Sequence, residues 1–178
     1  MRLNKSIISS FISILVGIAF FTAPAFSAPK DVKLLNSYIG NWRGSGELKR
    51  DGNIETVRCK LAITKAKAGK INYKGRCAVA GANFSIAGTM AYIKKAQRFE
   101  AVMSTSTSFS GVAIGKYSNK NDKEGIDFQL SDRNAETGDK FKISSNIALK
   151  EEMIGIDFIV TNKTTGRIVS ADIPFEMK

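Results

Sequence analysis

Two cysteines, Cys59 and Cys77, are the only thiols in the 178-residue chain, and their spacing points to disulfide chemistry. They lie in two stretches of alternating apolar and polar residues, on either side of a turn at Ala68. A hairpin that turns there places Cys59 opposite Cys77 and Val57 opposite Val79, with the apolar residues on one face. We expect one disulfide, which would close a loop of about 17 residues and stabilise the fold by roughly 3 kcal/mol. Two buried free thiols are the alternative.

The chain contains no histidine, and this absence removes most catalytic and metal-binding schemes. It excludes a serine or cysteine nucleophile activated by histidine, a histidine haem ligand, and ordinary zinc sites. The acidic residues Glu100, Asp127 and Asp157 alternate with apolar residues, so we expect them on an outer, solvated face. The sequence therefore predicts no catalytic residues, no metal and no cofactor, and a protein that is not an enzyme.

The N-terminal residues predict export. Arg2 and Lys5 precede an almost wholly apolar stretch at 7–21, which is followed by small residues suited to signal peptidase. Residues 1–27 are therefore expected to be a secretory signal peptide, cleaved after Ala25 or after Ser27. An uncleaved membrane anchor is the alternative, although the apolar run is shorter than the about 20 residues that span a bilayer. We expect a soluble periplasmic or secreted protein, in a compartment that permits a disulfide.

The elements that would hold these residues are one short helix and a long series of strands. Apolar residues recur at helical spacing over 31–39, with Asp31 as the expected N-cap and Gly40 as the stop. From there to the C-terminus the pattern alternates and is interrupted by turn residues. We expect ten strands, at 42–48, 54–65, 70–80, 84–93, 98–104, 109–117, 126–131, 140–149, 153–161 and 167–177. Residues 28–41 then form a lead-in and helix, and residues 42–178 form an all-β, antiparallel up-and-down β-barrel, which leaves no exposed edge.

The stretch GNWRGSGEL at 40–48 places Gly40 and Trp42 in a G-x-W pattern, after a short helix and before repeated hairpins. This arrangement resembles the calycin superfamily, which comprises lipocalins, fatty-acid-binding proteins and nitrobindin-like bacterial barrels. The resemblance implies that Trp42 lies at a closed end and packs against an arginine from near the end of the chain. Arg167 is the candidate, unless it is solvated in its turn. Nitrobindin-like barrels bind haem through histidine, so haem binding by that route is not carried over.

A barrel of ten strands can enclose a cavity, and several inward positions hold small residues, namely Gly75, Gly88, Gly111, Ala113, Gly115 and Ser145. The alternative is that these small residues pack beside large ones. We expect a small hydrophobic or amphipathic ligand in the interior. The expected ligand-binding residues are Trp42, Tyr73, Met90, Tyr92, Met103, Tyr117, Phe128, Phe158 and Arg167.

The formal net charge of +11 is distributed unevenly along the chain. If every connection is a hairpin, the end with the helix collects a basic surface of Lys65, Lys67, Lys70, Lys94, Lys95, Arg98, Lys116, Lys120 and Lys123. Such a surface favours an anionic envelope component as partner, with general solubility as the alternative. Nucleic acid is not expected, because aromatic residues do not interleave the lysines. The alternative to ligand binding is a non-catalytic envelope interaction or inhibitor protein that uses its loops and this basic surface.

Overall fold

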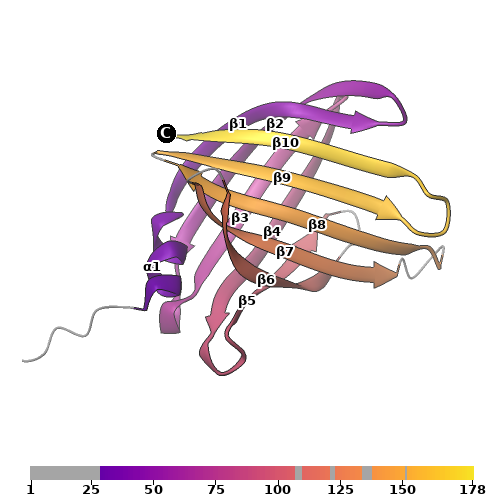
Figure 1. The fold of residues 1–178 in the computed structure, drawn as a ribbon. Coiled ribbons are helices and arrows are strands. Elements are labelled where there is room, and N and C mark those ends of the chain that lie inside the picture. The colour runs from indigo at the N-terminus through magenta and orange to yellow at the C-terminus, as the bar shows by residue number, and fades with distance from the viewer. Residues whose placement is uncertain (1–28, 107–109, 121–122, 134–137, 151) are drawn as a thin grey trace, which may run out of the picture.

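The structure is a computed structural model that describes residues 29–106, 110–120, 123–133, 138–150 and 152–178 (Figure 1). Ten antiparallel strands form a closed barrel, in which each strand pairs with its sequence neighbours and β1 pairs with β10. The predicted all-β, up-and-down barrel with one short helix is therefore confirmed. The predicted signal peptide at 1–27, with its cleavage after Ala25 or Ser27, lies outside the described residues.

All ten predicted strands are present, with ends shifted by a few residues. The helix α1 spans Lys30–Ser37, and two short 3₁₀ turns, η1 (Lys67–Gly69) and η2 (Lys94–Ala96), lie between strands. The strands are β1 (Gly40–Arg50), β2 (Asn53–Lys65), β3 (Ile71–Val79), β4 (Ala82–Ile93), β5 (Arg98–Thr105), β6 (Ser110–Lys120), β7 (Lys123–Arg133), β8 (Lys140–Lys150), β9 (Met153–Asn162) and β10 (Ile168–Met177).

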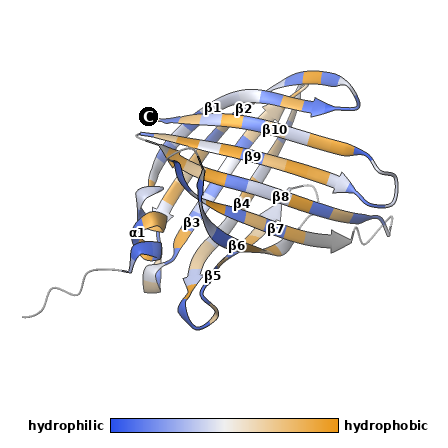
Figure 2. Cartoon of the chain, in the orientation of Figure 1, coloured by the Kyte–Doolittle hydropathy of each residue, from blue (hydrophilic) through white to orange (hydrophobic). Residues whose placement is uncertain are grey.

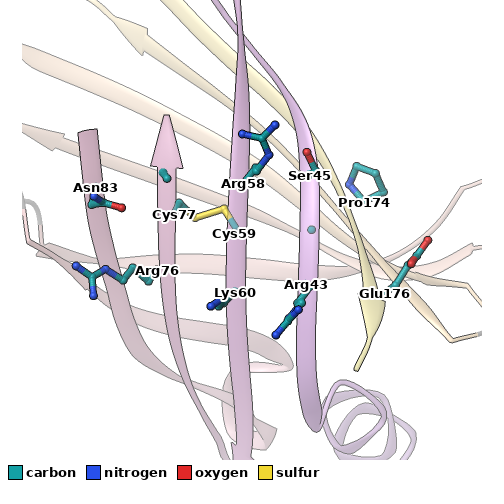
Figure 3. Close-up of a pocket in the computed structure, with 12 residues that line it drawn as sticks. Arg43, Ser45, Arg58, Cys59, Lys60, Arg76, Cys77, Asn83, Pro174 and Glu176 are labelled. Carbon is teal, nitrogen blue, oxygen red and sulfur yellow. A yellow bond between two sulfur atoms is a disulfide. The ribbon is translucent and has the colours of Figure 1, made fainter. Parts of the chain in front are cut away.

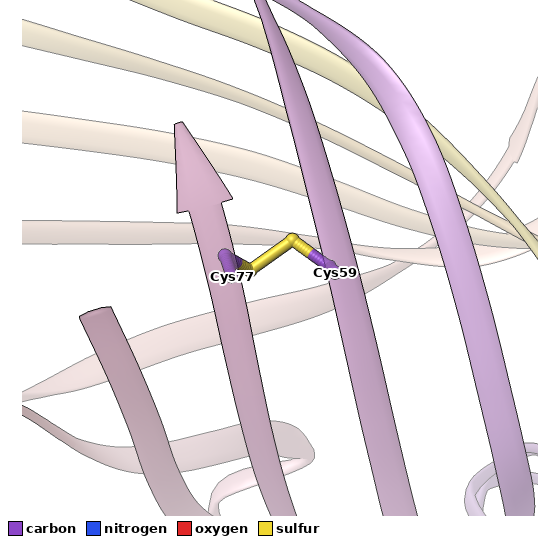
Figure 4. Close-up of a disulfide and its surroundings, with 2 residues drawn as sticks. All are labelled: Cys59 and Cys77. Atoms are coloured by element: carbon purple, nitrogen blue, oxygen red, sulfur yellow. A yellow bond between two sulfur atoms is a disulfide. The ribbon is translucent and has the colours of Figure 1, made fainter. Parts of the chain in front are cut away.

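The hairpin of β2 and β3 has the register that its alternating sequence predicts. Val57 pairs with Val79 and Cys59 pairs with Cys77, so the apolar residues of both strands share the inward face. Cys59 and Cys77 form a disulfide with an S–S distance of 2.01 Å, which joins the two strands (Figure 4). Both cysteines are buried. The predicted disulfide and its inward orientation are confirmed.

Helix α1 closes the barrel end at which β1 begins (Figure 1). Leu34, Leu35 and Tyr38 are buried against the inward residues of the strands. The Tyr38 hydroxyl donates a hydrogen bond to the Ile147 carbonyl at 3.1 Å, and the Trp42 indole N–H donates to the Tyr38 carbonyl at 2.9 Å. The buried Tyr38 hydroxyl and Trp42 indole N–H are therefore both satisfied, as burial requires, whereas the buried side-chain oxygen of Asn36 in α1 has no hydrogen-bond partner in the described part of the structure.

The start of α1 differs from the expectation that Asp31 would cap it. Pro29 precedes the helix, and its carbonyl accepts the backbone N–H groups of Val32 and Lys33 at 3.0 Å each. Asp31 lies in the first turn instead, where a carboxylate interacts favourably with the helix dipole. Gly40 opens β1 with an extended backbone and does not act as a helix stop.

The barrel closes between β1 and β10 at a point where the two backbones come very close. Gly44 pairs with Phe175 and Glu47 with Asp172, and the ladder is interrupted between these pairs, beside Pro174. A Cβ at Gly46 would collide with the Asp172 carbonyl, so only glycine permits this approach. Pro174 has no N–H to donate to β1, which fits the interruption of the ladder beside it.

Candidate functional site

The barrel interior is lined near α1 by buried side chains. Strand register assigns these residues to the inward face, and they form an apolar floor above the helix. They are Trp42, Leu61, Ile63, Ile71, Phe99, Ile126, Ile154 and Phe175. Their neighbours Tyr92, Ile147 and Leu149 at the same end are only partly buried.

Towards the opposite end, inward-facing apolar side chains are only half-buried. This set comprises Phe84, Ile86, Met103, Ala113, Ile143, Ile156, Phe158, Val160 and Val169. Figure 2 shows apolar and polar residues alternating along these strands. We call the part of the barrel interior beside these half-buried side chains the lumen; its wall is apolar.

The inward glycines do not create the lumen, because neighbouring side chains fill the space beside them. A Cβ at Gly75 would lie 2.9 Å from the Ile86 side chain, and one at Gly115 would lie 2.6 Å from the Phe128 ring. At Gly111 the nearest atom is Leu130 Cδ1, at 3.0 Å. These positions therefore show packing of small beside large residues, the alternative to a cavity.

The predicted ligand-binding residues differ in burial. Trp42 and Tyr92 lie near α1, where Tyr92 packs edge-on against Phe99 with ring centroids 5.1 Å apart. Tyr73, Met90 and Phe128 are buried inward. Met103 and Phe158 are the two that reach the half-buried lumen wall.

The hydroxyl of Tyr73 is committed to the barrel wall. It donates to the Val102 carbonyl at 3.2 Å, through the space that a side chain at Gly88 would fill. Burial raises the pKa of Tyr73 to about 12, so its hydroxyl stays protonated at neutral pH. Tyr73 therefore contributes its ring rather than its oxygen to the interior.

Arg167 does not pack against Trp42, and this prediction is wrong. Arg167 lies in the turn before β10 and forms an ion pair with Asp51 at the lumen end. Trp42 pairs with Met177, at the other end of β10. An antiparallel β10 places its first residues next to the end of β1, which separates the two side chains by most of a strand.

Tyr117 also lies away from the lumen, so its predicted role there is wrong. It is partly exposed, and its hydroxyl donates to Glu124 at 2.8 Å. The Lys30 ammonium of α1 lies 4.4 Å from its ring centroid and 3.3 Å from the Glu124 carboxylate. Hydrogen bonds from Tyr117 and then from Lys30 lower the pKa of Glu124. Tyr117 thus helps to fasten α1 onto β6 and β7.

The predicted basic surface gathers at the α1 end. Lys65, Lys67 and Lys70 border η1, and Lys94, Lys95 and Arg98 border η2. These six side chains, together with Lys116 and Lys123, are exposed. The side chain of Lys120 lies outside the described part of the structure. Arg98 is paired with Glu100 at 2.6 Å, so its charge is partly neutralised.

A second basic site lies on the outer wall, and the sequence reasoning did not select it. Four cationic side chains, Arg43, Arg58, Lys60 and Arg76, project from β1, β2 and β3 into a groove (Figure 3). The groove has a volume of about 710 Å³, and the remaining residues that line it are Gly44, Ser45, Cys59, Cys77, Ala78, Asn83, Pro174 and Glu176. We call it the outer groove.

Part of the signal for the outer groove is visible in the sequence. Arg58, Lys60 and Arg76 occupy the polar face of the hairpin whose other face holds the disulfide. Arg43 joins them because β1 pairs with β2 and places Arg43 beside Lys60. The contribution of Pro174 and Glu176 depends on closure between β1 and β10, which alternation alone does not fix.

Among the described residues, no group of three or more histidine, cysteine, aspartate or glutamate side chains is arranged to hold a metal ion. The described helices include none that is long and apolar enough to cross a bilayer.

No protein-family model and no curated protein matches the sequence. Several solved structures share the fold, and two of them are compared with this chain. Rv2717c from M. tuberculosis superposes with a TM-score of 0.68 at 12% identity, over 85% of this chain and 99% of that protein. The S-type phycobiliprotein lyase CPES from Guillardia theta superposes with a TM-score of 0.59 at 10% identity, over 82% of this chain and 91% of the lyase. At these identities the likeness establishes a shared barrel fold and nothing about function.

The comparison corrects one expectation from the sequence. We expected a protein that is not an enzyme, because the chain has no histidine and its acidic residues are scattered. CPES is a lyase, which is an enzyme, and it has the same barrel architecture as this chain. The expectation is therefore wrong, since this fold does not separate binding proteins from enzymes.

Proposed function

We propose that the protein binds a small hydrophobic or amphipathic molecule in its lumen, as a distant member of the calycin superfamily. One observation carries the proposal: inward-facing apolar side chains such as Phe84, Met103 and Phe158 are half-buried inside a closed wall. Concave, mostly apolar sites are typical of small-molecule binding. The calycin-like folds of the two solved structures support this assignment.

The lining defines the chemistry of the ligand. Inward residues of β8 and β9 are aliphatic or aromatic, with Ser145 as a single small polar side chain between Phe128 and Phe158. The apolar tail of an amphipathic ligand would contact Trp42 and its neighbours at the floor near α1. Its polar head would stay in water at the opposite end. Burial of apolar surface supplies the affinity, at roughly 25 cal/mol per Å² before the costs of association.

Ser145 and Ser144 provide a matched pair of substitutions for the test. Ser145 faces the lumen, and Ser144, its neighbour, faces outward between Gln129 and Ile159. Ser145→Trp should fill lumen space, whereas Ser144→Trp adds the same side chain to the outer wall. Binding of the amphipathic fluorescent probe 1-anilinonaphthalene-8-sulfonate is then measured by titration.

We expect the probe to bind the unsubstituted protein and Ser144→Trp with similar affinity, and Ser145→Trp at least about tenfold more weakly. Thermal unfolding shows that both variants are folded. Equal affinity of the two variants would refute a lumen site, as would failure of the unsubstituted protein to bind. Mass spectrometry of an organic extract of the purified protein then identifies the natural ligand class.

Export is part of the same proposal. The buried disulfide between Cys59 and Cys77 supports an oxidising compartment, because cytosolic thiols are kept reduced. N-terminal sequencing of the protein recovered from its own cells should begin at Phe26 or at Ala28, the residues that follow cleavage after Ala25 or after Ser27. A chain that retains Met1 and residues 2–27 would refute this part.

A second candidate partner is an anionic envelope component, held at the basic surface of the α1 end. The exposed lysines beside η1 and η2, including Lys94 and Lys95, favour it. Sedimentation with vesicles that contain phosphatidylglycerol should then decrease for the pair Lys94→Gln and Lys95→Gln, and with added salt. Binding that is insensitive to both changes would exclude this surface.

A further inference from the structure

We propose that the outer groove is a separate binding site for a compact anion that carries several phosphate groups. The groove lies on the opposite side of the barrel wall from the lumen, so it serves a ligand different from the one proposed above. Its cations come from three adjacent strands: Arg43 from β1, Arg58 and Lys60 from β2, and Arg76 from β3.

Strand register sets the spacing of these cations. Arg43 pairs with Lys60 and Lys60 pairs with Arg76, so the three form one row across the strands. Adjacent strands lie about 4.8 Å apart, which places the backbones of Arg43 and Arg76 about 10 Å from each other. Arg58 lies two residues along β2 from Lys60, a rise of about 7 Å. Four positive charges therefore surround a space the size of a small oligoanion.

The arginines of the outer groove differ from the other arginines whose side chains are described. Outside the groove, Arg50 pairs with Glu55, Arg98 with Glu100 and Arg167 with Asp51. Within the described part of the chain, no carboxylate lies at ion-pair distance from the four groove cations. The charge of the groove is thus left for a ligand.

One carboxylate does line the groove and must be considered. Glu176 is the cross-strand neighbour of Arg43 on β10. The two side chains form no ion pair, and Figure 3 shows the Glu176 carboxylate pointing away from the Arg43 guanidinium. Glu176 therefore marks the edge of the groove on the β10 side, and the net charge of its lining remains positive.

The chemistry of the lining favours phosphate. Three of the four cations are arginine, although lysine outnumbers arginine in the chain as a whole. The planar guanidinium group binds phosphate through two parallel hydrogen bonds, which a lysine ammonium does not provide. The amide of Asn83 and the hydroxyl of Ser45 add neutral hydrogen-bonding groups to the same lining.

The hollow shape favours a compact soluble ligand over a membrane surface. The ladder of β1 and β10 is interrupted beside Pro174, and the groove lies beside this interruption, between the cations. A planar bilayer contacts protruding side chains, whereas a recess of about 710 Å³ surrounds a small molecule. We therefore assign the outer groove to a soluble oligophosphate rather than to a lipid headgroup in a membrane.

Calorimetric titration of the purified protein with inorganic tripolyphosphate and with orthophosphate tests the assignment. The test variant is Arg58→Gln with Arg76→Gln, which removes two charges from exposed positions of the outer groove. The control is Lys142→Gln with Lys163→Gln, which removes two exposed charges that belong neither to the outer groove nor to the basic surface at the α1 end. We expect tripolyphosphate to bind at least about tenfold more tightly than orthophosphate. The test variant should lose at least about tenfold in affinity, and the control less than about twofold.

Three outcomes would overturn the proposal. Equal losses of tripolyphosphate affinity in the test and control variants would show that the anion responds only to the net charge of the protein. Equal affinity for tripolyphosphate and orthophosphate would show that the cations do not act together. Binding of phosphatidylglycerol vesicles that depends on Arg58 and Arg76, without tripolyphosphate binding, would assign the groove to a membrane. Thermal unfolding monitors the fold, and Arg76→Gln alone replaces the double variant if that variant is unfolded.

Discussion

Removal of the crosslink between Cys59 and Cys77 should lower the free energy of unfolding by about 3 kcal/mol. The two cysteines are 18 residues apart in sequence, and a crosslink over that distance restricts the unfolded chain. The loop-entropy relation gives about 10.7 cal/mol/K for a loop of this size, or roughly 3.2 kcal/mol at 25 °C. The folded barrel keeps β2 beside β3 through their hydrogen bonds, so the loss falls mainly on the unfolded state.

The assay is equilibrium unfolding in urea, followed by the fluorescence of Trp42. Trp42 is the only tryptophan and is 2% exposed, so its emission reports the apolar floor of the barrel. Both cysteines are buried, and the disulfide is therefore reduced in the unfolded state before refolding under reductant. Oxidised and reduced proteins contain the same side-chain atoms except for the crosslink, which isolates its effect from packing.

The double variant Cys59→Ala and Cys77→Ala supplies the control. It should be insensitive to reductant and at least as destabilised as the reduced protein, because it also lacks two buried sulfur atoms. The reasoning is refuted if the free energies of unfolding of the reduced and oxidised proteins differ by less than about 1 kcal/mol. Such a difference is far below the value that the loop-entropy relation gives for this loop.

Three further predictions concern the barrel wall and α1. Gly88→Ala should lower the unfolding free energy by about 1–3 kcal/mol, because a methyl group there collides with the Val102 carbonyl and the Tyr73 hydroxyl; urea unfolding measures it. Arg167→Ala and Trp42→Phe should be additive within about 0.5 kcal/mol, and coupling above 1 kcal/mol would contradict their separation. Glu124 has a pKa below its ordinary value of 4.5, so its stabilising effect is present above that pH and is lost as the pH falls through the lowered value. Glu124→Gln should therefore reduce stability at neutral pH and leave it unchanged in acid.

The fold was predictable from the sequence because two independent constraints agree on the same register. Alternation assigns residues of β2 and β3 to faces, and the cysteine pair fixes which residues are opposite each other. A shift of one residue would move every apolar side chain to the other face. Ten alternating segments with short turns then leave closure as the simplest way to avoid edges.

The site was less predictable, because alternation gives a residue's face but not its level along the barrel. Arg167 shares the alternation of Val169, but β10 begins at Ile168, so Arg167 belongs to the turn. The antiparallel pairing of first and last strands could have located it, since Arg50 meets Val169 and Trp42 meets Met177. The same limit applies to Tyr117, whose position near Lys30 depends on how α1 docks.

The glycine-rich inward face shows why composition does not locate a cavity. At Gly75 and Gly115 the missing side chain is replaced by Ile86 and Phe128 from neighbouring strands, so the small residue allows a large one to fold inward. The lumen is instead detected through half-buried large residues such as Met103 and Phe158, whose exposure depends on the whole barrel. Only a three-dimensional structure supplies that quantity.

The hairpin of β2 and β3 separates the two proposed sites and gives each a different chemistry. Its inward residues, including Cys59 and Cys77, are buried on the side of the apolar lumen. Its outward residues Arg58, Lys60 and Arg76 supply most of the positive charge of the outer groove. Because successive side chains of a strand point to opposite faces, substitutions on one face leave the other face in place. The disulfide fixes the register on which this separation depends, so one buried crosslink supports both the apolar interior and the cationic exterior.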